Sequence, residues 1–244
     1  MSARTLLGIL TPSSNTVLEP VIAAMLAEVE DISAHFGRFR VIEIALSSNA
    51  LAQFDQVEIL GAAELLSHAR CQVIGWGGTS SGWLGFERDR RLCEAIQRST
   101  GALACSSVLA LNEVLKLTGV RRLGLVTPFR GDVQQAIVRN YAAEDIDCSA
   151  ERHLCLRDNF SFADVEAGQI REMVREVLAG SGSSRPQAVA LFCTNLRGAP
   201  LVAELEEEFG VPVYDTVATV VWKALKLAGR DTAEVKGWGS LFSL

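Results

Sequence analysis

The chain has 244 residues, 49% of them apolar, which is enough to bury a sizeable core in one domain or two small ones. Its net charge of -6 and the lack of a dense Lys/Arg run argue against nucleic acid or an anionic membrane surface as the main partner, and leave small anionic molecules as candidate ligands. No apolar stretch approaches the roughly eighteen residues of a membrane-spanning helix, and the first residues lack the apolar run of a signal peptide, so we expect a cytoplasmic protein.

Short apolar runs rich in β-branched residues alternate along the chain with longer segments of helical period. The runs predict strands at 6–10, 39–45, 72–76, 104–106, 123–126, 187–192 and 211–214. The longer segments predict helices at 18–30, 56–68, 87–100, 109–117, 133–144, 162–179, 200–209 and 218–227. This alternation predicts an α/β fold in which parallel sheets are flanked by helices.

The second half of the chain repeats the first. Residues 7–12 read LGILTP and residues 123–128 read LGLVTP, and Gly78-Thr79-Ser80 aligns with Cys193-Thr194-Asn195. We therefore expect two lobes related by a pseudo-twofold axis, with the active site in the cleft between them. The last strand and helix are expected to fold back onto the first half, so the N-terminal lobe takes residues 1–117 and 209–244, and the C-terminal lobe residues 118–208.

Four polar loops follow the predicted strands, at 11–16, 77–82, 127–132 and 193–198. In open α/β sheets, ligands bind beyond the carboxyl ends of the strands. The hydroxyl, amide and backbone N–H groups of such loops hold a carboxylate or a developing oxyanion. Ser13 to Thr16 also precede a predicted helix, which leaves two roles open for them: substrate binding, or helix capping with Glu19 closing a capping box.

Cys193 is the candidate catalytic residue, because it ends a predicted strand and is followed by the polar Thr194 and Asn195. A thiol there can give or take a proton at carbon, or attack as a thiolate. The other cysteines form no CxxC pair and the histidines show no zinc-binding spacing, so no metal is expected. The glycines form neither a Walker loop nor a GxGxxG turn, so no nucleotide cofactor is expected either.

Five short motifs carry a family resemblance: PSSNT at 12–16, the polar loop at 78–80, TPF at 127–129, the pair Asp158-Asn159, and CTNLR at 193–197. Together they resemble the aspartate/glutamate racemase superfamily, and within it the maleate cis-trans isomerase group and arylmalonate decarboxylase. The resemblance implies a cofactor-free site between two α/β lobes and a small-molecule carboxylate or dicarboxylate as substrate. It implies Cys193 as the catalytic residue and, as substrate-binding residues, Pro12, Ser14, Asn15, Gly78, Thr79, Ser80, Phe129, Asn159 and Thr194.

Gly78 separates the two groups within this resemblance. Racemases and maleate isomerases of the superfamily use two cysteines, one from each lobe, and the first falls at Gly78 in this chain. Arylmalonate decarboxylase resembles the chain here, because it has Gly-Thr-Ser and keeps only the later cysteine. The motifs PSSNT and CTNLR and Asn159 look more like the isomerase group. The family usually has Tyr at the position of Phe129, so one hydroxyl donor is absent.

A single thiol favours decarboxylation of a 2-substituted malonate, because loss of CO2 itself generates the carbanion and only one proton donor is needed. In this hypothesis Thr79, Ser80 and Asn15 hold one carboxylate, the other lies against Trp83, Phe129 and Leu196, and a neutral Cys193 thiol protonates the enediolate. Two alternatives stay open: a maleate-type isomerase or racemase that tolerates Gly78, and a non-catalytic carboxylate-binding protein. The sequence also leaves a homo-oligomer open.

Overall fold

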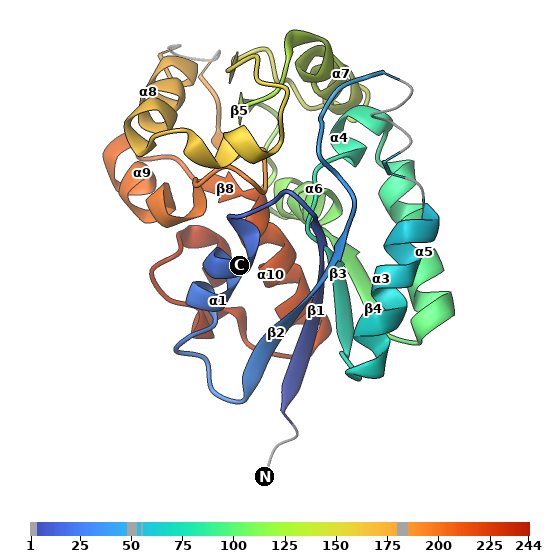
Figure 1. The fold of residues 1–244 in the computed structure, drawn as a ribbon. Helices are drawn as coiled ribbons and strands as arrows, with labels where there is room; N and C mark the ends of the chain where they lie inside the picture. Colours follow the sequence, from blue (N-terminus) through green and yellow to red (C-terminus); the bar gives the residue numbers. More distant parts are fainter. Residues whose placement is uncertain (1–3, 48–52, 55, 180–184) are drawn as a thin grey trace.

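The computed structural model describes residues 4–47, 53–54, 56–179 and 185–244, which contain two four-stranded sheets (Figure 1). The first sheet, in the order β2-β1-β3-β4, consists of β1 (Thr5–Pro12), β2 (Ile32–Phe39), β3 (Val73–Trp76) and β4 (Leu103–Ser106). The second, in the order β6-β5-β7-β8, consists of β5 (Leu123–Thr127), β6 (Glu151–His153), β7 (Ala188–Leu191) and β8 (Val213–Asp215). All neighbouring strands are parallel. The predicted two-lobed α/β fold is confirmed, and the matching strand orders confirm the repeat.

Helices flank both sheets. The first sheet lies between α3 (Gln56–His68) and α5 (Glu87–Thr100) on one side and α1 (Leu18–Met25) and α10 (Thr216–Leu227) on the other, as Figure 1 shows. Further along the chain are α4 (Ser81–Leu84), α6 (Ser107–Thr118) and α7 (Gly131–Ala142). Two more, α8 (Ala167–Val177) and α9 (Val202–Phe209), pack against strands of the second sheet. Within the described residues, no helix is long and apolar enough to cross a membrane.

The prediction of a strand at 39–45 is wrong, because β2 lies before this segment and ends at Phe39. The segment after it joins the other lobe instead: the Ile44 N–H donates to the Arg157 carbonyl (3.1 Å), and the Asn159 N–H donates to the Ile42 carbonyl (3.2 Å). β2 is an edge strand whose side chains are mostly half-buried, so its sequence lacks the continuous apolar run of a central strand. The apolar run that follows crosses between the lobes.

The last strand also differs from expectation. β8 pairs with β7 and completes the second sheet, whereas we expected this strand to join the first lobe with the helix that follows. The link from α9 to β8 spans only Gly210 to Pro212, which is too short to carry the chain to the other sheet. The final helix does cover the first sheet, where α10 packs on α6, β3 and β4. The chain therefore passes from the second lobe to the first between Asp215 and Thr216.

Smaller differences concern element ends and short elements. Helix α1 ends at Met25, five residues before the expected end, and α8 begins at Ala167 after a separate 3-10 turn, Phe160–Asp164. The three-residue edge strand β6 and the one-turn helix α4 lack the apolar periodicity that a sequence pattern needs. The other expected elements lie within two or three residues of their predicted bounds.

Candidate active site

The loops that follow β1, β3 and β7 meet between the two lobes. The Asn15 side-chain amide donates to the Thr194 hydroxyl (3.2 Å), and that hydroxyl donates to the Gly77 carbonyl (3.0 Å). Asn15 and Thr194 are 1% and 4% exposed, so these bonds are shielded from water. The repeat-related loops of the two lobes are therefore in direct contact beyond the carboxyl ends of their strands.

Asn15 has two roles in this junction. Its side-chain carbonyl oxygen accepts from the backbone N–H groups of Val17 and Leu18 (both 2.9 Å) and so caps the start of α1. Its amide nitrogen bridges to Thr194 in the other lobe. Glu19 does not close a capping box, because its carboxylate pairs with Arg38 at 2.8 Å.

Asn195 is a bridging residue that the sequence analysis did not include among the site residues. Its side-chain carbonyl oxygen accepts from the N–H of Thr16 (2.9 Å) and its amide donates to the Asn159 carbonyl (2.5 Å). Asn159 in turn donates to the Ser14 hydroxyl (2.7 Å), which donates to a backbone carbonyl of the first lobe. The alignment of Asn195 with Ser80 in the repeat was the available signal for it.

Cys193 lies two residues after the end of β7 and is 3% exposed. Burial raises the pKa of its thiol to about 12; the N–H groups of Asn195 and Leu196 lower it in part, and the nearby Asp215 carboxylate raises it. The thiol is therefore protonated at neutral pH and can serve as a proton donor rather than as a resting nucleophile.

The loop 78–80 aligns with Cys193-Thr194-Asn195 in the repeat and offers hydroxyls instead of a thiol. Thr79 and Ser80 are 6% and 5% exposed, and within the described residues their hydroxyl groups make no hydrogen bond. Neither oxygen is among the side-chain atoms of the described residues that are both fully buried and unpaired, so both hydroxyls remain accessible and are free to bind a ligand. Ser80 is also the N-cap residue of α4, and its carbonyl accepts from the N–H of Leu84 (2.9 Å).

Gly78 has no room for a side chain. A Cβ added there would lie 2.1 Å from the indole ring of Trp76, a side chain that is 1% exposed and packs against Phe39 with ring centroids 5.2 Å apart. A cysteine at this position would need the Trp76 ring to move. The indole therefore occupies the space of the first-lobe thiol.

Aromatic rings form a buried cluster beside the polar loops. Phe129 is 1% exposed, and its ring lies edge-on to Trp83 (5.3 Å between centroids) and to Phe162 (5.7 Å). Trp83 also contacts Phe54 at 5.9 Å. Phe129 thus provides an apolar surface where a Tyr would provide a hydroxyl. Pro12, the last residue of β1, and Leu196 are also buried.

Asp215 is a second feature that sequence reasoning missed. It is fully buried, and one carboxylate oxygen accepts from the Val217 N–H (2.7 Å) to cap α10, while the other oxygen has no partner in the described part of the chain. Burial raises the pKa of this carboxyl to about 7. Among the described residues, no group of three or more His, Cys, Asp or Glu side chains is arranged to hold a metal ion.

Comparison with known proteins identifies the family of the chain. The family model for arylmalonate decarboxylase matches residues 15–242, nearly the whole chain. The chain belongs to the arylmalonate decarboxylase family. Its relatives include maleate isomerase of Geobacillus stearothermophilus, 24% identical over 97% of this chain and 96% of that protein. Arylmalonate decarboxylase of Bordetella bronchiseptica is 26% identical over 75% of this chain and 76% of that protein.

The solved structures agree with this assignment. A variant of Nocardia farcinica maleate cis-trans isomerase, with a covalently bound succinylcysteine intermediate, superimposes with a TM-score of 0.87 at 25% identity and covers 98% of each chain. More of the matched relatives carry the name maleate isomerase than arylmalonate decarboxylase. Members of the family are thus enzymes of two kinds, isomerases and decarboxylases, and the expected superfamily resemblance is confirmed.

Proposed function

We propose that the chain is a cofactor-free decarboxylase of 2-substituted malonates, with Cys193 as its proton donor. The observation that carries the proposal is the Trp76 ring at the side-chain position of Gly78. An isomerase or racemase that works with one thiol from each lobe has no space for the first thiol here. A decarboxylase needs only the second.

The other cysteines do not replace the missing thiol. Cys71 precedes β3 and so lies at the amino end of the sheet, away from the polar loops. Cys105 points to the Val220 carbonyl of α10 at 4.0 Å, and Cys93 interacts with Cys105. Cys148 and Cys155 belong to the same lobe as Cys193 and cannot supply a group from the opposite one.

In the proposed mechanism, one carboxylate of the malonate binds to the unpaired hydroxyls of Thr79 and Ser80. The second lies against the Trp83 and Phe129 rings, where its charge is poorly solvated. The bond between this carboxylate and the α-carbon breaks, CO2 leaves, and the electron pair remains as an enediolate that the hydroxyls stabilise. The Cys193 S–H proton is then transferred to the α-carbon, and the thiolate takes a proton from solvent.

The raised pKa of Cys193 supports the donor role. A thiol with a pKa of about 12 retains its proton throughout the neutral range and is quickly reprotonated after each turnover. A mechanism that begins with nucleophilic attack needs the opposite shift, toward a thiolate. Asn15 contributes in this scheme by fixing the loop geometry, since both ends of its side chain already have protein partners.

Isomerisation of maleate is the second candidate function. It is favoured by the names of most relatives and by the family's use of a cysteine in the Nocardia farcinica intermediate. It requires that water or another group act at the position closed by Trp76.

The test is CO2 release from phenylmalonate and methyl-phenylmalonate by the purified protein, with maleate followed in parallel. We expect release by the wild type and a loss of about 100-fold or more in both Cys193→Ala and Cys193→Ser, since general acid catalysis contributes about that much. Cys155→Ser, which changes an exposed thiol, is the matched control and should keep full activity. Conversion of maleate without CO2 release would replace the proposal with the isomerase, and ligand binding without turnover would indicate a binding protein.

A further inference from the structure

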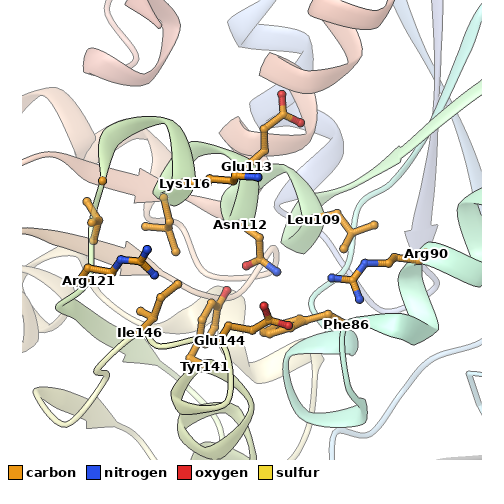
Figure 2. A pocket seen from close by; sticks show the side chains of 13 residues that line it. Phe86, Arg90, Leu109, Asn112, Glu113, Lys116, Arg121, Tyr141, Glu144 and Ile146 are labelled. Carbon is orange, nitrogen blue, oxygen red and sulfur yellow. The ribbon is translucent and has the colours of Figure 1, made fainter.

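A cavity of about 600 Å³ lies between α5 and α6 of the first lobe and the segment around α7 of the second (Figure 2). This volume is in the range of pockets that bind small organic molecules. None of the residues proposed above for the reaction lines it. Its walls are largely apolar, formed by Phe86, Leu109, Leu115, Val120 and Ile146.

Two buried polar groups without partners lie in this cavity. The Tyr141 side chain is fully buried, and its hydroxyl makes no hydrogen bond within the described residues. The side-chain oxygen of Asn112 is likewise buried and unpaired there. A buried polar group without a partner is unfavourable, so a ligand that pairs with these two groups would gain from contacts that the protein leaves unmade. Burial raises the pKa of Tyr141 well above its ordinary value, which keeps its hydroxyl a donor.

The charges around the cavity favour an anion. Figure 2 shows the guanidinium groups of Arg121 and Arg90 at opposite ends, with Asn112 and Tyr141 between them in this view. Lys116 adds a third cation. Arg90 pairs with Glu87 of its own helix at 3.4 Å, and Glu113 pairs with Lys223 at 2.5 Å, which leaves Arg121 and Lys116 against Glu144. In a protein of net charge -6, this local excess of positive charge attracts a small acid.

We propose that the cavity binds a small organic acid with an apolar body and acts as an effector site. The apolar body lies among Phe86, Leu109 and Ile146, the acid group at Arg121, and the Tyr141 hydroxyl donates to the ligand. The proposal concerns binding and does not rest on the reaction proposed above.

Helix α7 connects this cavity to two of the polar loops of the candidate active site, 77–82 and 193–198. The Tyr141 ring packs against Phe192, with centroids 6.0 Å apart, and Phe192 directly precedes Cys193. The neighbouring Asn140 donates from its side-chain amide to the Gly82 carbonyl (2.8 Å), two residues after Ser80. A ligand that immobilises the Tyr141 ring therefore also restricts the motion of the Phe192 ring and of the backbone at Cys193.

Calorimetric titration with 1-naphthoate, a carboxylate on an apolar body, tests the binding. We expect saturable binding that weakens by about tenfold in Arg121→Ala and in Tyr141→Phe, as loss of one hydrogen bond to a charged ligand does. Tyr141→Phe keeps the ring and removes only the unpaired hydroxyl, so the variant should fold. Arg98→Ala, an exposed arginine of α5 outside the cavity, is the control and should bind as the wild type does.

Two results would overturn the binding proposal. One is the absence of saturable binding at millimolar naphthoate. The other is binding that the cavity variants leave unchanged and that Thr79→Val abolishes, which would place naphthoate at the candidate active site.

The effector role has a separate readout, the hydrogen-exchange rate of the backbone amides of residues 192–196, measured by mass spectrometry. We expect saturating naphthoate to slow this exchange by about fivefold or more, the lower end of typical coupling between sites, and to have no effect in Arg121→Ala. Equal exchange rates with and without naphthoate in the wild type would overturn the effector role. Neither measurement requires a substrate.

Discussion

Thr79 and Thr219 are buried threonines that differ in what their hydroxyls contact. The Thr79 hydroxyl has no partner among the described residues, whereas the Thr219 hydroxyl donates to the Ser107 carbonyl at 2.8 Å. We predict that Thr79→Val lowers the rate of CO2 release by about 100-fold, since it removes a donor from the proposed oxyanion site, and leaves stability nearly unchanged. Thr219→Val should do the reverse, with full activity and a loss of about 1 kcal/mol in the free energy of unfolding.

Both variants are checked by steady-state kinetics and urea denaturation. Full activity in Thr79→Val would contradict the placement of the substrate carboxylate. A large loss of stability in that variant would mean that the hydroxyl serves the fold instead.

Gly78 and Gly61 are glycines in opposite environments. A Cβ at Gly78 meets the Trp76 ring, whereas a Cβ at Gly61, exposed in the middle of α3, meets no atom within 4 Å. We predict that Gly78→Ala destabilises the protein by about 1–3 kcal/mol through overpacking. Gly61→Ala should stabilise it by about 0.5–1 kcal/mol, because alanine favours a helix interior.

Urea denaturation of the two variants gives this comparison. In a Trp76→Phe background, which leaves space beside residue 78, the cost of Gly78→Ala should become smaller. An unchanged cost would show that the Trp76 ring is not what closes the position.

At the scale of elements, the cap of α10 gives a pH-dependent contribution to stability. The Asp215 carboxyl has its pKa raised by burial to about 7, so the folded state binds its proton more tightly than the unfolded state does. Its contribution to stability is fully present below about pH 4 and is lost as the pH rises through about 7. The free energy of unfolding of the wild type, minus that of Asp215→Asn, should therefore fall between these pH values, by roughly 4 kcal/mol at most.

Urea denaturation at a series of pH values measures this difference. Asp215→Ser, which also removes the titrating group but keeps a capping oxygen, should give the same slope as a second reference. A difference that rises with pH, or stays flat, would contradict a raised pKa for Asp215.

Strands and helices with a continuous apolar run or a clear helical period could be predicted from the sequence, and those without such a pattern could not. The central strands β1, β3, β5 and β7 are apolar runs because both of their faces are covered by helices. The edge strands β2 and β6 are mostly half-exposed and lack a continuous apolar run. After β2, Val41, Ile44 and Ala45 are buried where the chain crosses between the lobes rather than in a sheet.

The same limit applies to the candidate site. The polar loops and the place of Cys193 among them could be predicted, because the repeat aligns these loops and ligands bind beyond the carboxyl ends of parallel strands. The Trp76 ring beside Gly78 and the unpaired oxygen of Asp215 depend on packing between residues whose contacts no sequence pattern encodes. The contact between the Tyr141 and Phe192 rings, next to Cys193 in the chain, likewise depends on tertiary packing.

At the scale of the whole molecule, the passage of the chain from β8 to α10 joins the lobes. β8 completes the second sheet and α10 covers the first, and Asp215 at their junction caps the helix. Neither lobe keeps its full set of elements without the other. We therefore predict that the two sheets unfold together, with equal free energies of opening for the amides of β1 and β5 in native-state hydrogen exchange.

Val220→Ala makes this prediction more stringent. Val220 is fully buried in α10 and faces Gly75 of the first sheet so closely that a Cβ there would lie 2.7 Å away. Its truncation should cost about 2 kcal/mol, and hydrogen exchange should report the same loss at β5 of the second sheet as at β1. Leu117→Ala, at an exposed end of α6, should change neither. If only β1 loses protection in Val220→Ala, the lobes unfold independently, and α10 belongs energetically to the first lobe alone.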